Sequence, residues 1–174
     1  MDTSRDERWI DLGVLGRPRG LRGDLWFRAY NEFTEALSEG ARVRATSAKG
    51  DARTLTVETI HPEGKGLVVT FEEVRGRDAA EALVNATLSL QRKHFPALEP
   101  GEYYHCDLPG LAVLDAAGAR VGEVLGVEAY PSVDALRVSL GGEEVEVPVT
   151  EDYVLAMDLD AGTVTVDLDA VRAE

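Results

Sequence analysis

Short runs in which polar and apolar residues alternate recur along most of this 174-residue chain. A period of two places alternate side chains on one face of a β-strand. In the first half, alternation marks residues 42–46, 54–58 and 87–91, β-rich runs cover residues 9–15 and 24–30, and residues 67–71 are apolar on both faces, as in a central strand. In the second half, runs of these kinds cover residues 111–114, 120–130, 135–140, 144–149 and 163–168. Many short strands at hairpin spacing predict an all-β protein whose first half is a small six-stranded barrel.

One or two short helices are expected between strands of the first half. One would begin at Asn31 and cover residues 32–37. The other would be capped by Asp78 and cover residues 79–84. Neither is long enough to change the all-β fold class.

The charge of the chain changes sharply near residue 98. Residues 1–98 hold 15 Lys and Arg against 15 Asp and Glu, whereas residues 99–174 hold 3 against 17. The whole net charge of −14 therefore lies in the second half. This asymmetry favours two domains with different partners. Salt adaptation or solubility is the alternative, but we would expect either to spread the acidic excess over both halves.

The change in charge coincides with a run, residues 100–111, that is bracketed by two Pro-Gly turns. The run holds two of the five tyrosines and the single cysteine, and we expect it to be extended. Tyr103 and Tyr104 would then point to opposite faces, so that one ring can enter a core while the other faces solvent or a partner. The predicted limits are residues 8–94 for the first domain, 95–102 for a linker and 103–170 for the second domain.

The cysteine content and the termini indicate the compartment. The single Cys106 cannot form an intramolecular disulfide, which fits a reducing environment. The first eight residues are polar with both signs of charge, unlike a signal peptide. No apolar run approaches the ~20 residues needed to span a bilayer. We expect a soluble cytoplasmic protein, a monomer with no membrane partner.

Four glycines lie within residues 13–23, a density that is also found in phosphate-binding loops. A P-loop needs Gly-Lys-Ser/Thr before a helix, and a dinucleotide fingerprint also needs a following helix; a strand follows here. A hairpin turn is the better interpretation, with Gly16 and Pro18 ending the strand that begins at Trp9. Four arginines lie on or beside this loop. Clustered guanidinium groups on a flexible backbone are well suited to binding the phosphates of RNA. An ordinary solvated loop is equally compatible with these residues: Arg17, Arg19, Arg22 and Arg28.

His105, Cys106 and Asp107 are consecutive residues of metal-ligand type. On a strand only His105 and Asp107 would share a face, and no Cys-x-x-Cys or His-x-x-x-His pair completes a zinc site. A Cys106 nucleophile with His105 as its base also fails, because neighbours on a strand point apart. The sequence therefore predicts a binding protein with no catalytic residue, metal or cofactor.

Two stretches resemble the signatures of the RimM family of bacterial ribosome maturation factors. Residues 13–25, Gly-Val-Leu-Gly-Arg-Pro-Arg-Gly-Leu-Arg-Gly-Asp-Leu, resemble the first signature, with Arg19 in place of the usual His and Asp24 in place of Glu. Residues 102–111, Glu-Tyr-Tyr-His-Cys-Asp-Leu-Pro-Gly-Leu, resemble the second, with Pro109 in place of an aliphatic residue. Residues 147–149 and 153–159 are similar to the closing strands of the family.

The resemblance implies two tandem barrels, a translation-factor-like barrel followed by a PRC barrel. It also implies a factor that binds the immature small ribosomal subunit and assists assembly of its head and processing of its rRNA. The PRC barrel would bind ribosomal protein nineteen of the small subunit, with Tyr103 and Tyr104 as contact or support. The neutral first domain would approach small-subunit rRNA through Arg17, Arg19 and Arg22.

The charge distribution agrees with these partners. Ribosomal proteins are basic, so a domain with 17 carboxylates suits one as a partner and would repel naked RNA. Two alternatives remain open. A stand-alone PRC-barrel adaptor would leave the arginine loop without a role, and an RNA-processing enzyme would need a catalytic constellation that the sequence does not offer.

Overall fold

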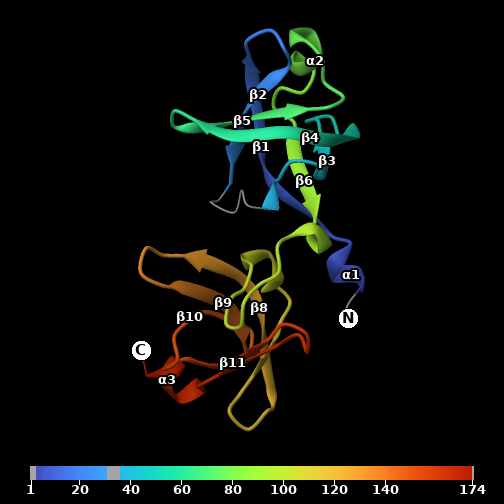
Figure 1. Ribbon diagram of the computed structural model, residues 1–174. Coiled ribbons are helices and arrows are strands. Elements are labelled where there is room, and N and C mark those ends of the chain that lie inside the picture. The colour runs from blue at the N-terminus through green and yellow to red at the C-terminus, as the bar shows by residue number, and fades with distance from the viewer. Residues whose placement is uncertain (1–2, 31–35, 174) are drawn as a thin grey trace. The chain divides into compact units, whose positions relative to one another are not determined.

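The computed structural model describes residues 3–30 and 36–173, and contacts divide the chain into two compact units, residues 3–97 and 98–173 (Figure 1). Each unit has its own sheet and its own hydrophobic core. The predicted fold class, two small barrels in tandem with short helices, is confirmed. The helix expected at 32–37 lies largely outside the described residues.

The unit of residues 3–97 is a closed antiparallel barrel in the order β1-β2-β5-β4-β3-β6. Four of its strands, β2, β3, β5 and β6, follow the predicted runs closely, whereas β1 and β4 extend beyond theirs. Its strands are β1 (Trp9–Arg19), β2 (Asp24–Ala29), β3 (Arg42–Thr46), β4 (Ala52–Glu63), β5 (Gly66–Phe71) and β6 (Thr87–Gln91). Helix α1 (Thr3–Asp6), helix α2 (Arg77–Glu81) and the 3-10 turn η2 (Arg92–His94) complete it.

Strand β1 is longer than the sequence predicted, because Gly16 and Pro18 do not end it. The pairing with β2 shifts register between Leu15 and Pro18. Such an irregularity accommodates a proline, which has no N–H for the ladder, without ending the strand. The extension carries the two arginines Arg17 and Arg19 out to the hairpin loop.

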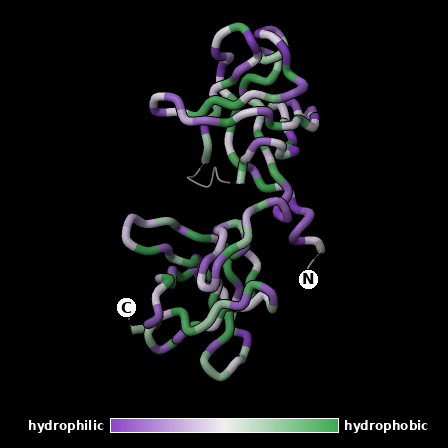
Figure 2. The backbone as a smooth tube through the Cα atoms, viewed as in Figure 1, coloured by the Kyte–Doolittle hydropathy of each residue, from purple (hydrophilic) through white to green (hydrophobic). Residues whose placement is uncertain are grey.

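Alternation explains the core of the barrel. In β2, Leu25 and Phe27 are buried while Asp24 and Trp26 lie on the other face. Figure 2 shows the same interleaving of hydrophobic and hydrophilic positions along the strands. The core comprises residues of every strand, among them Leu15, Val43, Leu55, Val69 and Leu88.

Helix α2 differs from its predicted bounds. It covers Arg77–Glu81, its N-cap is Gly76, and no side chain caps it, so Asp78 lies in the first turn. The chain leaves the helix region at Asn85, whose φ of 66° lies in the left-handed region that Asn tolerates better than most residues.

The unit of residues 98–173 is a barrel-like sheet in the order β10-β9-β8-β7-β12-β11. Pairing is antiparallel except between β12 and β7, which are parallel. Its strands are β7 (Ala112–Leu114), β8 (Arg120–Ala129), β9 (Asp134–Leu140), β10 (Glu143–Pro148), β11 (Val154–Asp158) and β12 (Thr163–Val166). A 3-10 turn, η3 (His105–Asp107), precedes the sheet and helix α3 (Leu168–Arg172) follows it.

The alternation of β9 and β10 has the predicted direction. Leu136 and Val138 are fully buried, while Glu144 and Glu146 are exposed. The run predicted over 163–168 ends earlier than expected, because the Asp167 side chain accepts hydrogen bonds from two backbone N–H groups and starts α3. No helix in the described part of the chain has the length and apolar content needed to cross a membrane.

Candidate functional site

The loop between β1 and β2, residues 20–23, is held by the segment before α2. Gly76 donates its N–H to the carbonyl of Arg22 at 3.1 Å, and Arg77 donates to the carbonyl of Gly20 at 3.2 Å. A Cβ on Gly23 would lie 2.7 Å from the carbonyl oxygen of Val74, so the two segments approach closely. The backbone of the loop is thus fixed while its side chains point outward.

The predicted arginines lie on this fixed support, and the structure distinguishes among them. All three are exposed. The Arg19 Nε donates to Glu63 at 2.7 Å, and its guanidinium also lies 3.9 Å from Asp24. Within residues 3–30 and 36–173, Arg17 and Arg22 make no ion pair. Arg17 and Arg22 therefore offer charge for a partner, whereas the charge of Arg19 is offset.

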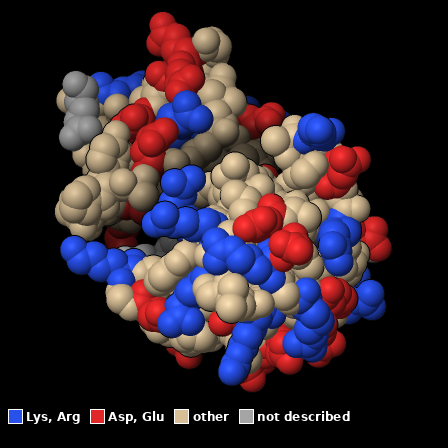
Figure 3. All heavy atoms as spheres, turned by 90° about the horizontal axis from the view of Figure 1, so that it is seen from above, with Lys and Arg blue, Asp and Glu red and all other residues tan. Residues whose placement is uncertain are grey.

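Figure 3 views the molecule from above and shows basic side chains interspersed with carboxylates on this face. At the tip of the loop, Leu21 is 77% exposed.

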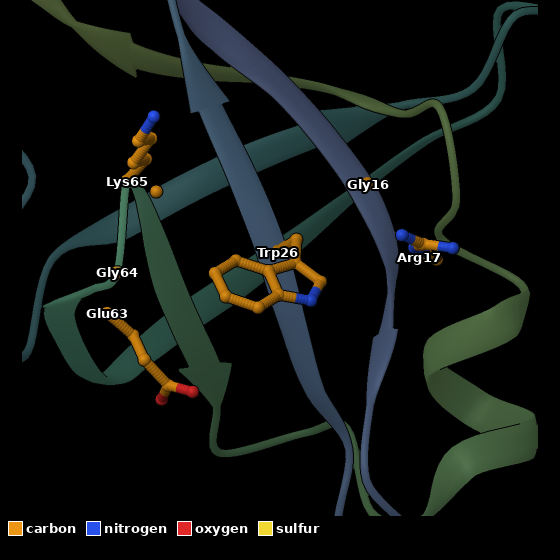
Figure 4. Close-up of a pocket in the computed structure, with 7 residues that line it drawn as sticks. Gly16, Arg17, Trp26, Glu63, Gly64 and Lys65 are labelled. Atoms are coloured by element: carbon orange, nitrogen blue, oxygen red, sulfur yellow. The ribbon is translucent and has the colours of Figure 1, made fainter.

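A shallow groove beside the loop contains a residue that the sequence reasoning missed. The groove, of about 520 Å³, has the Trp26 indole on its floor (Figure 4). Arg17 lies on one side and Lys65 on the other. Its lining is Gly16, Arg17, Trp26, Glu63, Gly64, Lys65 and Gly66. The sequence signal for this groove is a tryptophan on a predicted strand with glycines on the neighbouring strands. Recognising that these glycines lie beside Trp26 required the register of β1, β2 and β5, which the structure supplies.

In the other unit, the predicted extended run is wrong for residues 105–107, which form the 3-10 turn η3. The tyrosines before it do not alternate between core and solvent. Tyr104 is 7% exposed, and Tyr103 is only partly exposed because it packs against the core of its unit. The turn curls the chain back, so that both rings lie against protein.

Tyr103, His105 and Asp134 form a hydrogen-bonded cluster. The Tyr103 hydroxyl donates to Asp134 Oδ2 at 2.8 Å, and His105 Nε2 lies 2.7 Å from the same oxygen. The Tyr103 and His105 rings stack with centroids 6.1 Å apart. Because Asp134 begins β9, the cluster ties the entry segment to the sheet.

The electrostatics of the cluster follow from burial and hydrogen bonding. Burial and the bond to Asp134 raise the pKa of Tyr103 to about 12, so the phenol stays protonated and remains a donor. Burial alone would raise the pKa of the Asp134 carboxyl, but hydrogen bonds from His105 and Tyr103 outweigh it and the pKa is lowered. Asp134 is therefore the ionised acceptor of the cluster at neutral pH.

The remaining candidate ligands do not converge. Cys106 is a partly buried thiol that forms no disulfide, and Asp107 is 4% exposed. In the part of the chain that the structure describes, no three His, Cys, Asp or Glu side chains gather closely enough to hold a metal ion.

The surface of the second unit is dominated by carboxylates. Two of its three basic residues already pair with acids: Arg120 lies 3.4 Å from Glu123, and Arg137 lies 3.3 Å from Glu128 and 3.2 Å from Glu144. Few positive charges thus offset its 17 acids. Three large hydrophobic residues are exposed on this unit and were missed by sequence reasoning: Leu125, Tyr130 and Leu155.

Comparisons with known proteins cover both units. The RimM N-terminal domain family matches residues 10–95, and the RimM PRC barrel domain family matches residues 105–170. A solved RimM protein of Pseudomonas aeruginosa is 22% identical, covers 92% of this chain and 97% of its own, and superposes with a TM-score of 0.45.

Relatives named ribosome maturation factor RimM align over nearly the whole chain. The protein of Sorangium cellulosum is 35% identical over 88% of this chain and 91% of its own length. That of Sphingopyxis alaskensis is 36% identical over 92% of this chain and 95% of its own length. These similarities support a role in ribosome maturation and bear out the resemblance noted in the sequence. The chain belongs to the RimM family.

Proposed function

We propose that this protein is a non-catalytic ribosome maturation factor of the cytoplasm that binds the immature small ribosomal subunit as a monomer. It assists assembly of the head of the subunit and processing of small-subunit rRNA. The observation that carries the proposal is the division of charge between two separately folded units. An acidic unit suits a basic ribosomal protein, and a unit with an arginine loop suits rRNA.

The second unit is the proposed binding site for ribosomal protein nineteen of the small subunit. Its carboxylates supply attraction at long range, and specificity requires local apolar contact. The proposed domain limits are 8–94 and 103–170 with linker 95–102.

Tyr103 and Tyr104 are proposed to serve this surface chiefly as supports. A phenol that donates to Asp134 and packs on the core fixes the position of the segment, and Tyr104 is buried beside it. Their replacement would displace the segment and the surface around it. The exposed residues Leu125 and Leu155 are better placed to supply direct apolar contact.

The first unit is the proposed rRNA contact, through Arg17, Arg19 and Arg22. The support for it is a loop whose backbone is anchored and whose guanidinium groups are exposed. Arg17 and Arg22 contribute more to it than Arg19, which is paired with Glu63.

Co-sedimentation tests the proposal. Purified protein added to a lysate is expected to travel with free small subunits and to be absent from assembled ribosomes. Equal distribution over free subunits and assembled ribosomes, or absence from both, would contradict a role in small-subunit maturation.

A further inference from the structure

The groove in the first unit has an aromatic floor that glycines leave accessible. Trp26 lies on β2 between β1 and β5. A Cβ on Gly66 would lie 3.2 Å from two carbons of the six-membered ring, and one on Gly16 would lie 3.2 Å from the Trp26 Cβ. On β5 the cross-strand partner of Trp26 is the fully buried Val68, and the indole extends over the two glycines, so that its other face looks into the groove (Figure 4).

Two cations flank this ring without being neutralised. Neither Arg17 nor Lys65 forms an ion pair among residues 3–30 and 36–173. The one carboxylate of the groove, Glu63, is engaged by Arg19 at 2.7 Å and lies 3.7 Å from His61. The groove therefore combines an open indole face with positive charge on two sides.

We propose that Trp26 is a stacking platform for one unpaired nucleobase of single-stranded RNA, with Arg17 and Lys65 binding the phosphates on either side of that base. Stacking on an aromatic ring between basic side chains is a general way to hold an unstacked base. The proposal rests on the proposed rRNA contact and adds to it a residue, a groove and a requirement for an unpaired base.

Charge favours RNA over a protein as the occupant. A side chain of a basic ribosomal protein would meet the positive charge of Arg17 and Lys65, whereas a nucleotide brings a ring and a phosphate together.

The test uses the full chain in a Trp9→Phe background, so that Trp26 is the only tryptophan and its fluorescence reports the groove. The probes are a short oligoadenylate RNA and an abasic ribose-phosphate oligomer of the same length and charge. We expect the oligoadenylate to quench Trp26 and to bind about tenfold tighter or more than the abasic oligomer, because stacking adds to phosphate attraction. The abasic oligomer should bind weakly and leave the fluorescence unchanged.

Variants separate the ring from the charges. Trp26→Leu should lose the preference for oligoadenylate, and Trp26→Phe should keep part of it, with binding read by anisotropy of labelled oligomers. Lys65→Ala should weaken both probes. Lys49→Ala is the matched control and should change neither, because Lys49 lies in the turn before β4 whereas Lys65 lies in the turn after it. Should Trp26→Leu fail to fold by circular dichroism, Trp26→Phe and Lys65→Ala decide.

Three results would overturn the platform. These are equal affinity for both oligomers, an unchanged preference in folded Trp26→Leu, and quenching by purified small-subunit proteins in place of RNA. Co-sedimentation with small subunits is read separately. If the protein prefers oligoadenylate but does not co-sediment with small subunits, the maturation role alone is refuted. If it co-sediments but shows no preference for oligoadenylate, the stacking platform alone is refuted.

Discussion

The β1–β2 loop and the segment around Tyr103 are the two regions proposed to meet the ribosome, and they are stabilised in opposite ways. The loop is anchored by backbone contacts to residues 74–77, and its basic side chains are left outside. The segment is anchored by its own side chains, through Tyr103 and His105 on Asp134 and through buried Tyr104. Side-chain changes in the loop should therefore alter binding alone, whereas changes in the segment should alter folding and binding together.

The largest effect is expected for Tyr104→Ala. Deleting a buried ring leaves a cavity and should lower the free energy of unfolding by about 3 kcal/mol or more. Tyr103→Phe keeps its ring, loses one hydrogen bond to a charged acceptor and should cost about 1–2 kcal/mol. Denaturant unfolding followed by circular dichroism measures both.

Tyr130→Ala is the control within the same unit, because Tyr130 is 48% exposed, and it should leave stability nearly unchanged. Equal stability of Tyr104→Ala and the unmodified protein would refute the supporting role. A folded Tyr103, Tyr104 double Ala variant that binds small subunits at full strength would remove both tyrosines from the binding surface.

The next effect concerns pH. Because the folded pKa of Asp134 is lowered, its contribution to stability is complete above its unfolded pKa of about 4 and is lost as the pH falls through the folded value. Asp134→Asn should cost about 2 kcal/mol at pH 7, and the difference from the unmodified protein should shrink below about pH 4. Unfolding measured from pH 3 to pH 7 tests this, and a difference that stays constant with pH would contradict it.

The smallest change in stability is expected in the loop. Arg17→Ala with Arg22→Ala should leave the free energy of unfolding within about 0.5 kcal/mol per site. Association with small subunits should weaken, and the slope of log affinity against log salt should fall by about 2. Adding Arg19→Ala should weaken the association with small subunits further. Its effect should be smaller than that of Arg17→Ala or of Arg22→Ala, because Arg19 already pairs with Glu63.

Lys49→Ala, an exposed basic residue on another turn, is the control for the loop variants and should bind as the unmodified protein does. Unaltered association of the Arg17, Arg19, Arg22 triple variant at moderate salt would show that the loop is merely solvated.

Most strands were predictable because alternation is a local property. The runs at residues 42–46 and 87–91 have the strand bounds of β3 and β6 in the structure. Glycine and proline were less reliable as indicators of where a strand ends. Gly16 and Pro18 read as a stop, yet the register shift in β1 absorbs them, and the Pro-Gly turns around residues 100–111 enclose a 3-10 turn where an extended run was expected.

The sites were less predictable because their contacts join residues far apart in sequence. Arg19 meets Glu63 across 44 residues, and Tyr103 meets Asp134 across 31. The Trp26 groove depends on the register that places Gly16 and Gly66 beside the indole. Composition therefore indicated which residue types each unit would offer, and only the fold shows which of them are already paired.

The division of partners between the two units is tested most directly with a fragment of residues 98–174, which contains a complete core of its own. Calorimetry at low salt should show that the fragment binds ribosomal protein nineteen of the small subunit and does not bind naked small-subunit rRNA. Raising the salt to physiological strength, where the Debye length is ~8 Å, should weaken the association by screening its carboxylates. A folded fragment that binds the rRNA and not the protein would contradict the division.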